Sequence, residues 1–181
     1  MAQTSQEIHN PRTGQRMVFL ETGADNGGEL LRIDSFNPPA KGEPEPEHVH
    51  PHQESGAKVI SGSLRFRVDG QERSLGPGQT ITIPPNTRHN FWNDGDEDAH
   101  SIQWFRPALD IAAFFETFFA LAQAGQLNAK GMPGLLQLAA MSNFGNEVRV
   151  TKPPWPVQRA VLSALAPIVR WRGYHARHEL P

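Results

Sequence analysis

Three histidines stand close together near residue 50, and their spacing suits a metal site. His48 and His50 form an H-x-H pair in the segment PEHVHPHQES, and His52 follows two residues later. Side chains at every second position of a β-strand point to the same face, so the imidazoles of such a pair can reach one ion. Farther along, His89 follows the proline-containing turn IPPNTR. If strand pairing brings His89 beside the pair, three neutral imidazoles meet.

The absence of cysteine limits what else can hold a metal. Because the chain has no cysteine, any metal must be bound by His, Asp, Glu or backbone oxygen. Neutral imidazole suits Fe, Zn, Ni and Cu. We therefore expect one divalent metal ion, with Fe, Zn, Ni, Mn and Cu as the candidates.

The part of the chain that carries the histidines has the pattern of a β-protein. Clusters of proline and glycine separate short apolar runs before residue 90, a spacing typical of sandwiches and barrels. In SLRFRVDG, apolar and basic residues alternate, which predicts a strand with one buried face. The sequence predicts strands at 17–21, 29–36, 47–50, 57–60, 63–68, 79–83, 89–92 and 99–106.

The last part of the chain has a helical period. Residues 108–125 carry a broad stripe of apolar residues, and Gly125 is the expected stop. Further helices are predicted over 135–141 and after the prolines at 153, where Pro167 should kink or end the last helix. We expect a single domain with an N-terminal segment and edge strand (1–28), a barrel (29–106) and a helical extension (107–181).

The apolar faces of the helical extension need a partner. We expect them to cover the barrel or a second subunit, since so many phenylalanines would otherwise be exposed. The alternative is a helix lying on a membrane, where Arg159, Arg170 and Arg172 would flank the apolar residues. These three arginines are a weak signal, and we expect no membrane partner.

Around its histidines the chain resembles the cupin superfamily. The first cupin motif, Gly, five residues, His-x-His, then Glu and a later Gly, is matched by Gly42, His48, His50 and Gly62. The second motif is matched by Gly78, Pro84, His89 and Asn93, with Asn86 in place of a turn glycine. The resemblance implies a mainly β fold: a cupin (double-stranded β-helix, or jelly-roll) barrel with C-terminal α-helices. It also implies a metal held by His48, His50 and His89.

The cupin pattern calls for a fourth ligand, and this chain departs from it there. The count back from Gly62 places Ser55 where cupins have Glu. Glu54 is one residue away, but a shift of one residue turns a strand side chain to the opposite face, so only a bulge would let it bind. His52 follows Pro51, which suggests that the strand has ended. We take Glu54 and His52 as candidate acid–base residues beside the metal.

Small residues and aromatic side chains suggest where a substrate would lie. Ser55, Gly56 and Ala57 would leave space near the ion, and aromatic rings would supply apolar walls. On the strand at 99–106, either Ile102 and Trp104 or Gln103 and Phe105 face inward, and we choose the first pair because it is more apolar. The candidate substrate-binding residues are Ser55, Phe66, Phe91 and Trp104.

Taken together, these features favour a small-molecule enzyme. The formal charge of −2 offers no general attraction to nucleic acid. The three-histidine set resembles that of thiol dioxygenases and acetylacetone dioxygenase. The resemblance implies a dioxygenase-like oxidoreductase acting on a small oxygenated or aromatic compound, with Fe(II) favoured as the metal and Zn, Ni, Mn or Cu as alternatives. The alternatives are a metal-dependent isomerase or lyase and a non-catalytic binding or sensing barrel. The resemblance to cupin barrels, which pair at their sheet edges, implies a homodimer, and pairing would protect an exposed edge. We expect the protein in the cytoplasm, because no stretch is apolar and long enough to cross a bilayer.

Overall fold

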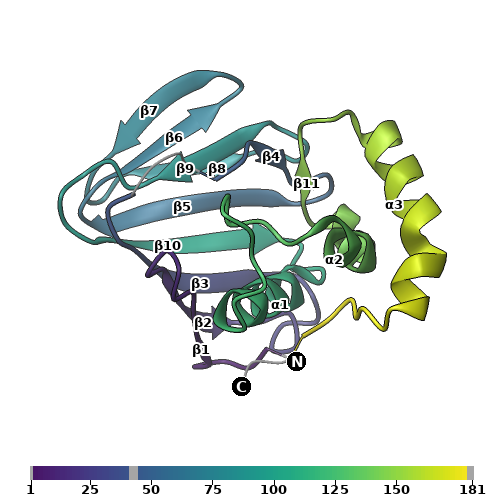
Figure 1. The fold of residues 1–181 in the computed structure, drawn as a ribbon. Helices are drawn as coiled ribbons and strands as arrows, with labels where there is room; N and C mark the ends of the chain where they lie inside the picture. The colour runs from purple at the N-terminus through teal and green to yellow at the C-terminus, as the bar shows by residue number, and fades with distance from the viewer. Residues whose placement is uncertain (1, 41–44, 179–181) are drawn as a thin grey trace.

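Two antiparallel sheets make up the body of the computed structural model, which describes residues 2–40 and 45–178 (Figure 1). In spatial order, the six-stranded sheet contains β1 (Glu7–His9), β2 (Arg16–Glu21), β3 (Leu31–Asn37), β10 (Ala99–Arg106), β5 (Glu54–Ser61) and β8 (Thr80–Ile83). The five-stranded sheet contains β11 (Arg149–Val150), β4 (His48–Val49), β9 (His89–Trp92), β6 (Leu64–Val68) and β7 (Gln71–Leu75). This is the predicted mainly β barrel, followed by helices.

Alternation along the strands places one face of each sheet in the core. In β5, for example, Ser55, Ala57 and Val59 are buried, whereas Lys58 and Ile60 are exposed. The inner faces of the two sheets share an apolar cluster, which excludes water between them. This cluster contains Ala57, Val59, Leu64, Phe66, Leu75, Ile83 and Ala99.

A second apolar cluster fills the other end of the six-stranded sheet, where α1 (Ile111–Gln123) covers β1, β2 and β3 (Figure 1). Phe119 is buried there, and Phe114, Phe115 and Phe118 pack against the same cluster. Burying one such phenylalanine stabilises the fold by roughly 2 kcal/mol. The helix ends as predicted, because Gly125 adopts a positive φ of 68°.

The strand predictions are correct where apolar alternation is strong. β9 and β10 have the predicted bounds. β5 begins at Glu54, earlier than predicted, because its first residues pair with the end of β10. The sequence does not predict β1, β7 or β11: β1 and β11 are very short, and QERSL of β7 is polar and almost wholly exposed.

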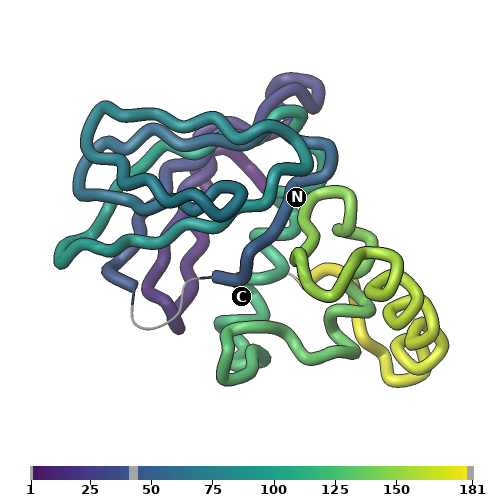
Figure 2. The backbone as a smooth tube through the Cα atoms, turned by 90° about the horizontal axis from the view of Figure 1, so that it is seen from above, coloured from purple at the N-terminus to yellow at the C-terminus, as the bar shows by residue number. Residues whose placement is uncertain are grey.

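The remaining helices lie at one side of the barrel (Figure 2). α2 (Leu135–Ala140) runs into the 3₁₀ helix η1 (Met141–Asn146), and α3 (Trp155–Trp171) packs on α2 at the edge of the molecule (Figure 1). Pro167 does not end α3, which continues to Trp171. Within the described residues, none of these helices is long and apolar enough to cross a membrane.

Candidate metal centre

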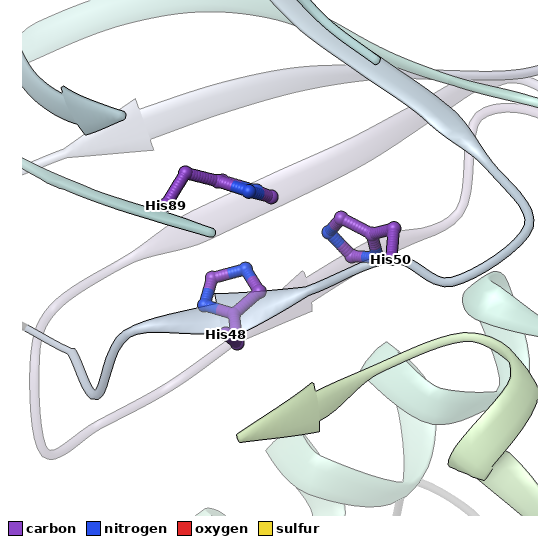
Figure 3. Close-up of side chains that lie close together, drawn as sticks. All are labelled: His48, His50 and His89. Carbon is purple, nitrogen blue, oxygen red and sulfur yellow. The ribbon is translucent and has the colours of Figure 1, made fainter. Parts of the chain in front are cut away.

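Strand pairing brings the three predicted histidines together. His48 and His89 are directly opposite each other in the pairing of β4 with β9, and His50 directly follows β4. One nitrogen from each ring lies within 4.8 Å of those of the other two. Figure 3 shows the three imidazoles gathered around one space. The period-two argument for the H-x-H pair therefore predicts the arrangement correctly.

Each imidazole is oriented by a backbone carbonyl. The Nδ1 atoms of His48, His50 and His89 lie 3.1, 2.6 and 2.9 Å from the carbonyl oxygens of Pro46, Glu147 and Thr87, respectively. A carbonyl oxygen can only accept, so each Nδ1 must carry the proton and donate it. The neutral tautomer that results leaves the lone pair of every Nε2 free. That is the form in which histidine binds a metal.

The electrostatics of the group keep the imidazoles neutral. Burial, together with the neighbouring His89, lowers the pKa of His50 from 6.5 to about 4. Burial and the neighbouring rings also hold the pKa of His48 well below its usual value. Burial lowers the pKa of His89, partly opposed by its hydrogen bond to Thr87. At neutral pH, no proton therefore competes with a metal for Nε2.

No carboxylate joins the histidines among the described residues. The residues there that could share one ion are His48, His50 and His89 alone. Ser55 is buried on the inner face of β5, as the motif count predicts, whereas Glu54 is on the opposite face. β5 shows no bulge at this point in its pairing with β10. His52 is exposed in the turn that follows the site. Neither candidate acid–base residue belongs to the metal group.

Aromatic rings border the histidines, but one of them is not the ring that the sequence favours. Phe66 and Phe91 stack in the core with ring centroids 5.4 Å apart, and Phe91 is two residues after His89 on the same face of β9. The burial pattern of β10 shows that Gln103 and Phe105 face inward. The ring of Phe105 lies 5.1 Å from that of His50. The choice of Ile102 and Trp104 as the inward pair is wrong.

Trp104 instead packs on the outer face of the sheet, which explains why residue 56 is glycine. A Cβ atom at Gly56 would lie 2.2 Å from the indole of Trp104. Gly56 therefore makes room for this ring and not for a substrate, contrary to the sequence prediction. Trp104 and Glu54, two of the predicted site residues, line a shallow outer hollow of about 370 Å³ together with Leu30, Arg32, Thr82 and Arg106.

Two buried polar groups on β10 have no hydrogen-bond partner. Ser101 and Gln103 point inward on the same face as Phe105, and their Oγ and Nε2 atoms are unpaired. Buried donors are rarely left unpaired, because each costs about 1–3 kcal/mol. They lie between the two apolar clusters, which makes this part of the interior polar. Gln103 is an inward-facing polar residue that the sequence reasoning does not choose, although strand parity leaves it open.

The C-terminal segment supplies one wall of the metal centre. β11 pairs with β4, so that Val150 is opposite His48 and Arg149 is opposite Val49. The amide of Thr151 also donates to the carbonyl of Glu47, 3.0 Å away. β11 is visible beside His48 and His50 in Figure 3. Nothing in the local sequence signals this contact, because it joins residues about a hundred positions apart.

Comparison with known proteins shows that the three histidines lie within a segment that matches a known protein family. The family model described as Cupin domain (Cupin_2) matches residues 39–105. This segment contains His48, His50 and His89 as well as Ser55. It ends before α1 and therefore excludes β11 and the helices.

Three curated relatives are similar to parts of the chain. Polyketide synthase CurC of Streptomyces cyaneus is 38% identical over 34% of this chain and 40% of its own length. An oxidoreductase of Arthrobotrys oligospora is 27% identical over 63% of this chain and 47% of its own length. Quercetin 2,3-dioxygenase of Bacillus subtilis is 27% identical over 58% of this chain and 28% of its own length. The matched parts are thus less than half of each relative.

Proposed function

The chain belongs to the cupin superfamily, and we propose that it is a metal-dependent oxidoreductase acting on a small oxygenated or aromatic compound. The observation that carries the proposal is the group of three neutral imidazoles, each with Nδ1 tied to a carbonyl and Nε2 free. The similarity to a named oxidoreductase and to a quercetin dioxygenase supports a redox reaction. Dioxygenation with Fe(II) is the reaction class that we favour.

The residues present fit a divalent metal. His48, His50 and His89 would hold it through Nε2, the donor atoms that their backbone contacts leave available. When bound, such an ion supplies coordination of substrate and activation of oxygen. The three ligands are neutral, so the site would keep two positive charges where a glutamate ligand would cancel one. We therefore propose that anionic, chelating substrates are preferred.

The other residues of the interior would position the substrate and exclude water. Phe66, Phe91 and Phe105 supply apolar surface for a planar or aliphatic group. The unpaired amide of Gln103 and hydroxyl of Ser101 can donate hydrogen bonds to an oxygen of the substrate. A substrate that carries both an apolar body and oxygen atoms would satisfy this lining best.

Metal reconstitution followed by oxygen uptake tests the proposal. Metal-free protein is loaded anaerobically with Fe(II), Mn(II), Ni(II), Cu(II) or Zn(II), and metal content is measured together with oxygen consumption on flavonols, β-diketones and catechols. We expect about one equivalent of Fe(II) and uptake with at least one chelating class. His89→Gln should abolish both. The matched control is His52→Gln, which changes an exposed histidine outside the group.

Two outcomes would redirect the proposal. Binding below about a tenth of an equivalent of every metal would remove the metalloenzyme and favour a metal-free binding barrel. Ser55 in place of the expected carboxylate is the observation that favours this second candidate. Metal binding without oxygen uptake, but with conversion of substrate under nitrogen, would instead indicate an isomerase or lyase.

A further inference from the structure

The last helix presents an apolar surface to solvent. Val157, Val161, Ala164, Ile168 and Trp171 recur at intervals of three or four residues, so they form one line along α3, which we call the outer stripe. The side chains of Val157, Val161, Ile168 and Trp171 are 50%, 43%, 43% and 79% exposed. An aligned set of exposed apolar residues of this kind marks an interaction surface.

Rotating α3 to bury the outer stripe would expose the side of the helix that is already packed. Val169 is buried, and Leu162 and Leu165 are half-buried on the side that contacts α2. Figures 1 and 2 place α3 at the edge of the molecule, on the far side of α2 from the barrel. The outer stripe is therefore available to something outside the chain.

The basic residues in and around α3 favour an anionic partner. The whole chain has a formal charge of −2, yet every charged residue between 148 and 178 is basic. Arg172 lies beside the outer stripe, with its guanidinium 5.1 Å from the ring centroid of Trp171. The residues concerned are Arg149, Lys152, Arg159, Arg170, Arg172 and Arg177, of which Arg177 is ion-paired with Asp110. A locally basic region in an acidic protein attracts an anionic surface.

We propose that α3 lies on an anionic lipid surface, with the outer stripe in the boundary between headgroups and acyl chains. A helix with one apolar face, basic residues and an exposed tryptophan has the composition of an interfacial helix. Arg159 and Arg170 share the face opposite the outer stripe, as the basic face of such a helix does. This proposal replaces the sequence-based expectation that the helical extension has no membrane partner.

A second copy of the chain is a poorer occupant of the same surface. Pairing two outer stripes would bring the two Arg172 side chains toward each other, with no acidic side chain on either α3 to compensate. Like charges brought close together oppose association. Anionic lipid, in contrast, gains from both the apolar and the basic residues of this helix.

Vesicle cosedimentation tests the proposal on the full chain. The native protein is mixed with vesicles of phosphatidylcholine alone or of phosphatidylcholine with phosphatidylglycerol, at low and high salt. We expect binding to the anionic vesicles and weakening by salt. Val161→Glu combined with Ile168→Glu should lower the partition coefficient at least tenfold, since it places two charges in the outer stripe. Ile60→Glu is the matched control, because Ile60 is 39% exposed on β5 of the barrel.

A second set of variants keeps the test informative should the glutamates unfold the helix. Arg159, Arg170 and Arg172 are exposed, and replacing all three by Gln should weaken binding roughly fivefold for each arginine that reaches the headgroups. Circular dichroism verifies the fold of every variant. Native protein that stays in the supernatant with both vesicle types overturns the proposal. Equal binding to neutral vesicles also contradicts it. So does a dimer that light scattering detects without lipid and that the double variant Val161→Glu and Ile168→Glu no longer forms.

Discussion

The Nδ1 atom of His50 donates to the backbone carbonyl of Glu147, 97 residues later in the chain, across 2.6 Å. This bond joins the metal centre to a segment outside the matched cupin region, which ends at residue 105. Because the carbonyl fixes the tautomer and the ring plane of His50, the C-terminal segment helps to build the three-histidine group. The helical extension thus orients one of the three histidines and is not only a cover for the barrel.

Loosening β11 should therefore weaken metal binding. The amide of Thr151 donates to the carbonyl of Glu47 and holds β11 against β4, the strand that carries His48. Thr151→Pro removes this donor and should raise the metal dissociation constant roughly tenfold, as the loss of a contact that orients a ligand does. Titration calorimetry measures the change. Thr151→Ala keeps the amide and should bind metal nearly as the native protein does; equal affinities in all three proteins would contradict a role for β11.

Ser55→Glu should rebuild the four-ligand site of the cupin pattern. Ser55 points to the interior from β5, so a carboxylate there would add an anionic oxygen ligand. We expect metal affinity to rise at least tenfold, about 1.4 kcal/mol, while turnover falls because the position for substrate or oxygen is taken. Competition with a fluorescent chelator gives the affinity. Ser55→Ala is the control, and a fall in affinity with Glu would show that this position does not face the ion.

Glu54→Gln should leave metal binding unchanged. Glu54 lies on the outer face of the sheet, in the hollow that also contains Trp104 and Arg106. The free energy of unfolding should change by no more than about 0.5 kcal/mol, as for most surface substitutions. Metal analysis by mass spectrometry checks this expectation. If the substitution stripped the metal, the register of β5 would have to be shifted by one residue.

Local periodicity explains why much of this site can be predicted from the sequence. The two-residue period fixes that His48 and His50 share a face and that Ser55 and Glu54 do not. Asn86 adopts the positive φ of 60° expected from its place in the motif, and its amide donates to the carbonyl of His50. These relationships depend on neighbours in the chain, which are visible in the sequence.

What the sequence does not predict depends on contacts across the fold. Hydrophobicity predicts Trp104 in the interior, but its ring packs over Gly56 on the outer face of the sheet. The polar Gln103 instead faces the interior, between the two apolar clusters. The contact of Glu147 with His50 joins distant residues and leaves no periodic signal. The apolar pattern alone cannot distinguish a covered barrel face from an exposed one.

Gly56→Ala should destabilise the protein without affecting the metal. The added methyl group would lie 2.2 Å from the indole of Trp104 and 2.6 Å from the carbonyl oxygen of Ile81. Overpacking of this kind costs about 1–3 kcal/mol. Chemical denaturation of the metal-free protein measures the loss, and calorimetry should show an unchanged metal affinity. An unchanged stability would mean that Trp104 is free to leave the sheet surface.

The metal-free protein should lose stability as the pH falls from 7 to 5. An unfolded histidine titrates near 6.5, whereas burial and the neighbouring His89 lower the pKa of folded His50 to about 4. Between these values the unfolded chain binds the extra proton and the folded chain does not, so protonation favours unfolding. His50 alone should contribute a loss of about 2 kcal/mol by pH 5. Denaturant titrations in the presence of a chelator at both pH values measure it. His50→Gln should reduce the pH dependence of stability by about this amount. The control His52→Gln, at an exposed turn position, should reduce it much less. An equal pH dependence in the native protein and in His50→Gln would show that His50 is not held neutral in the folded protein.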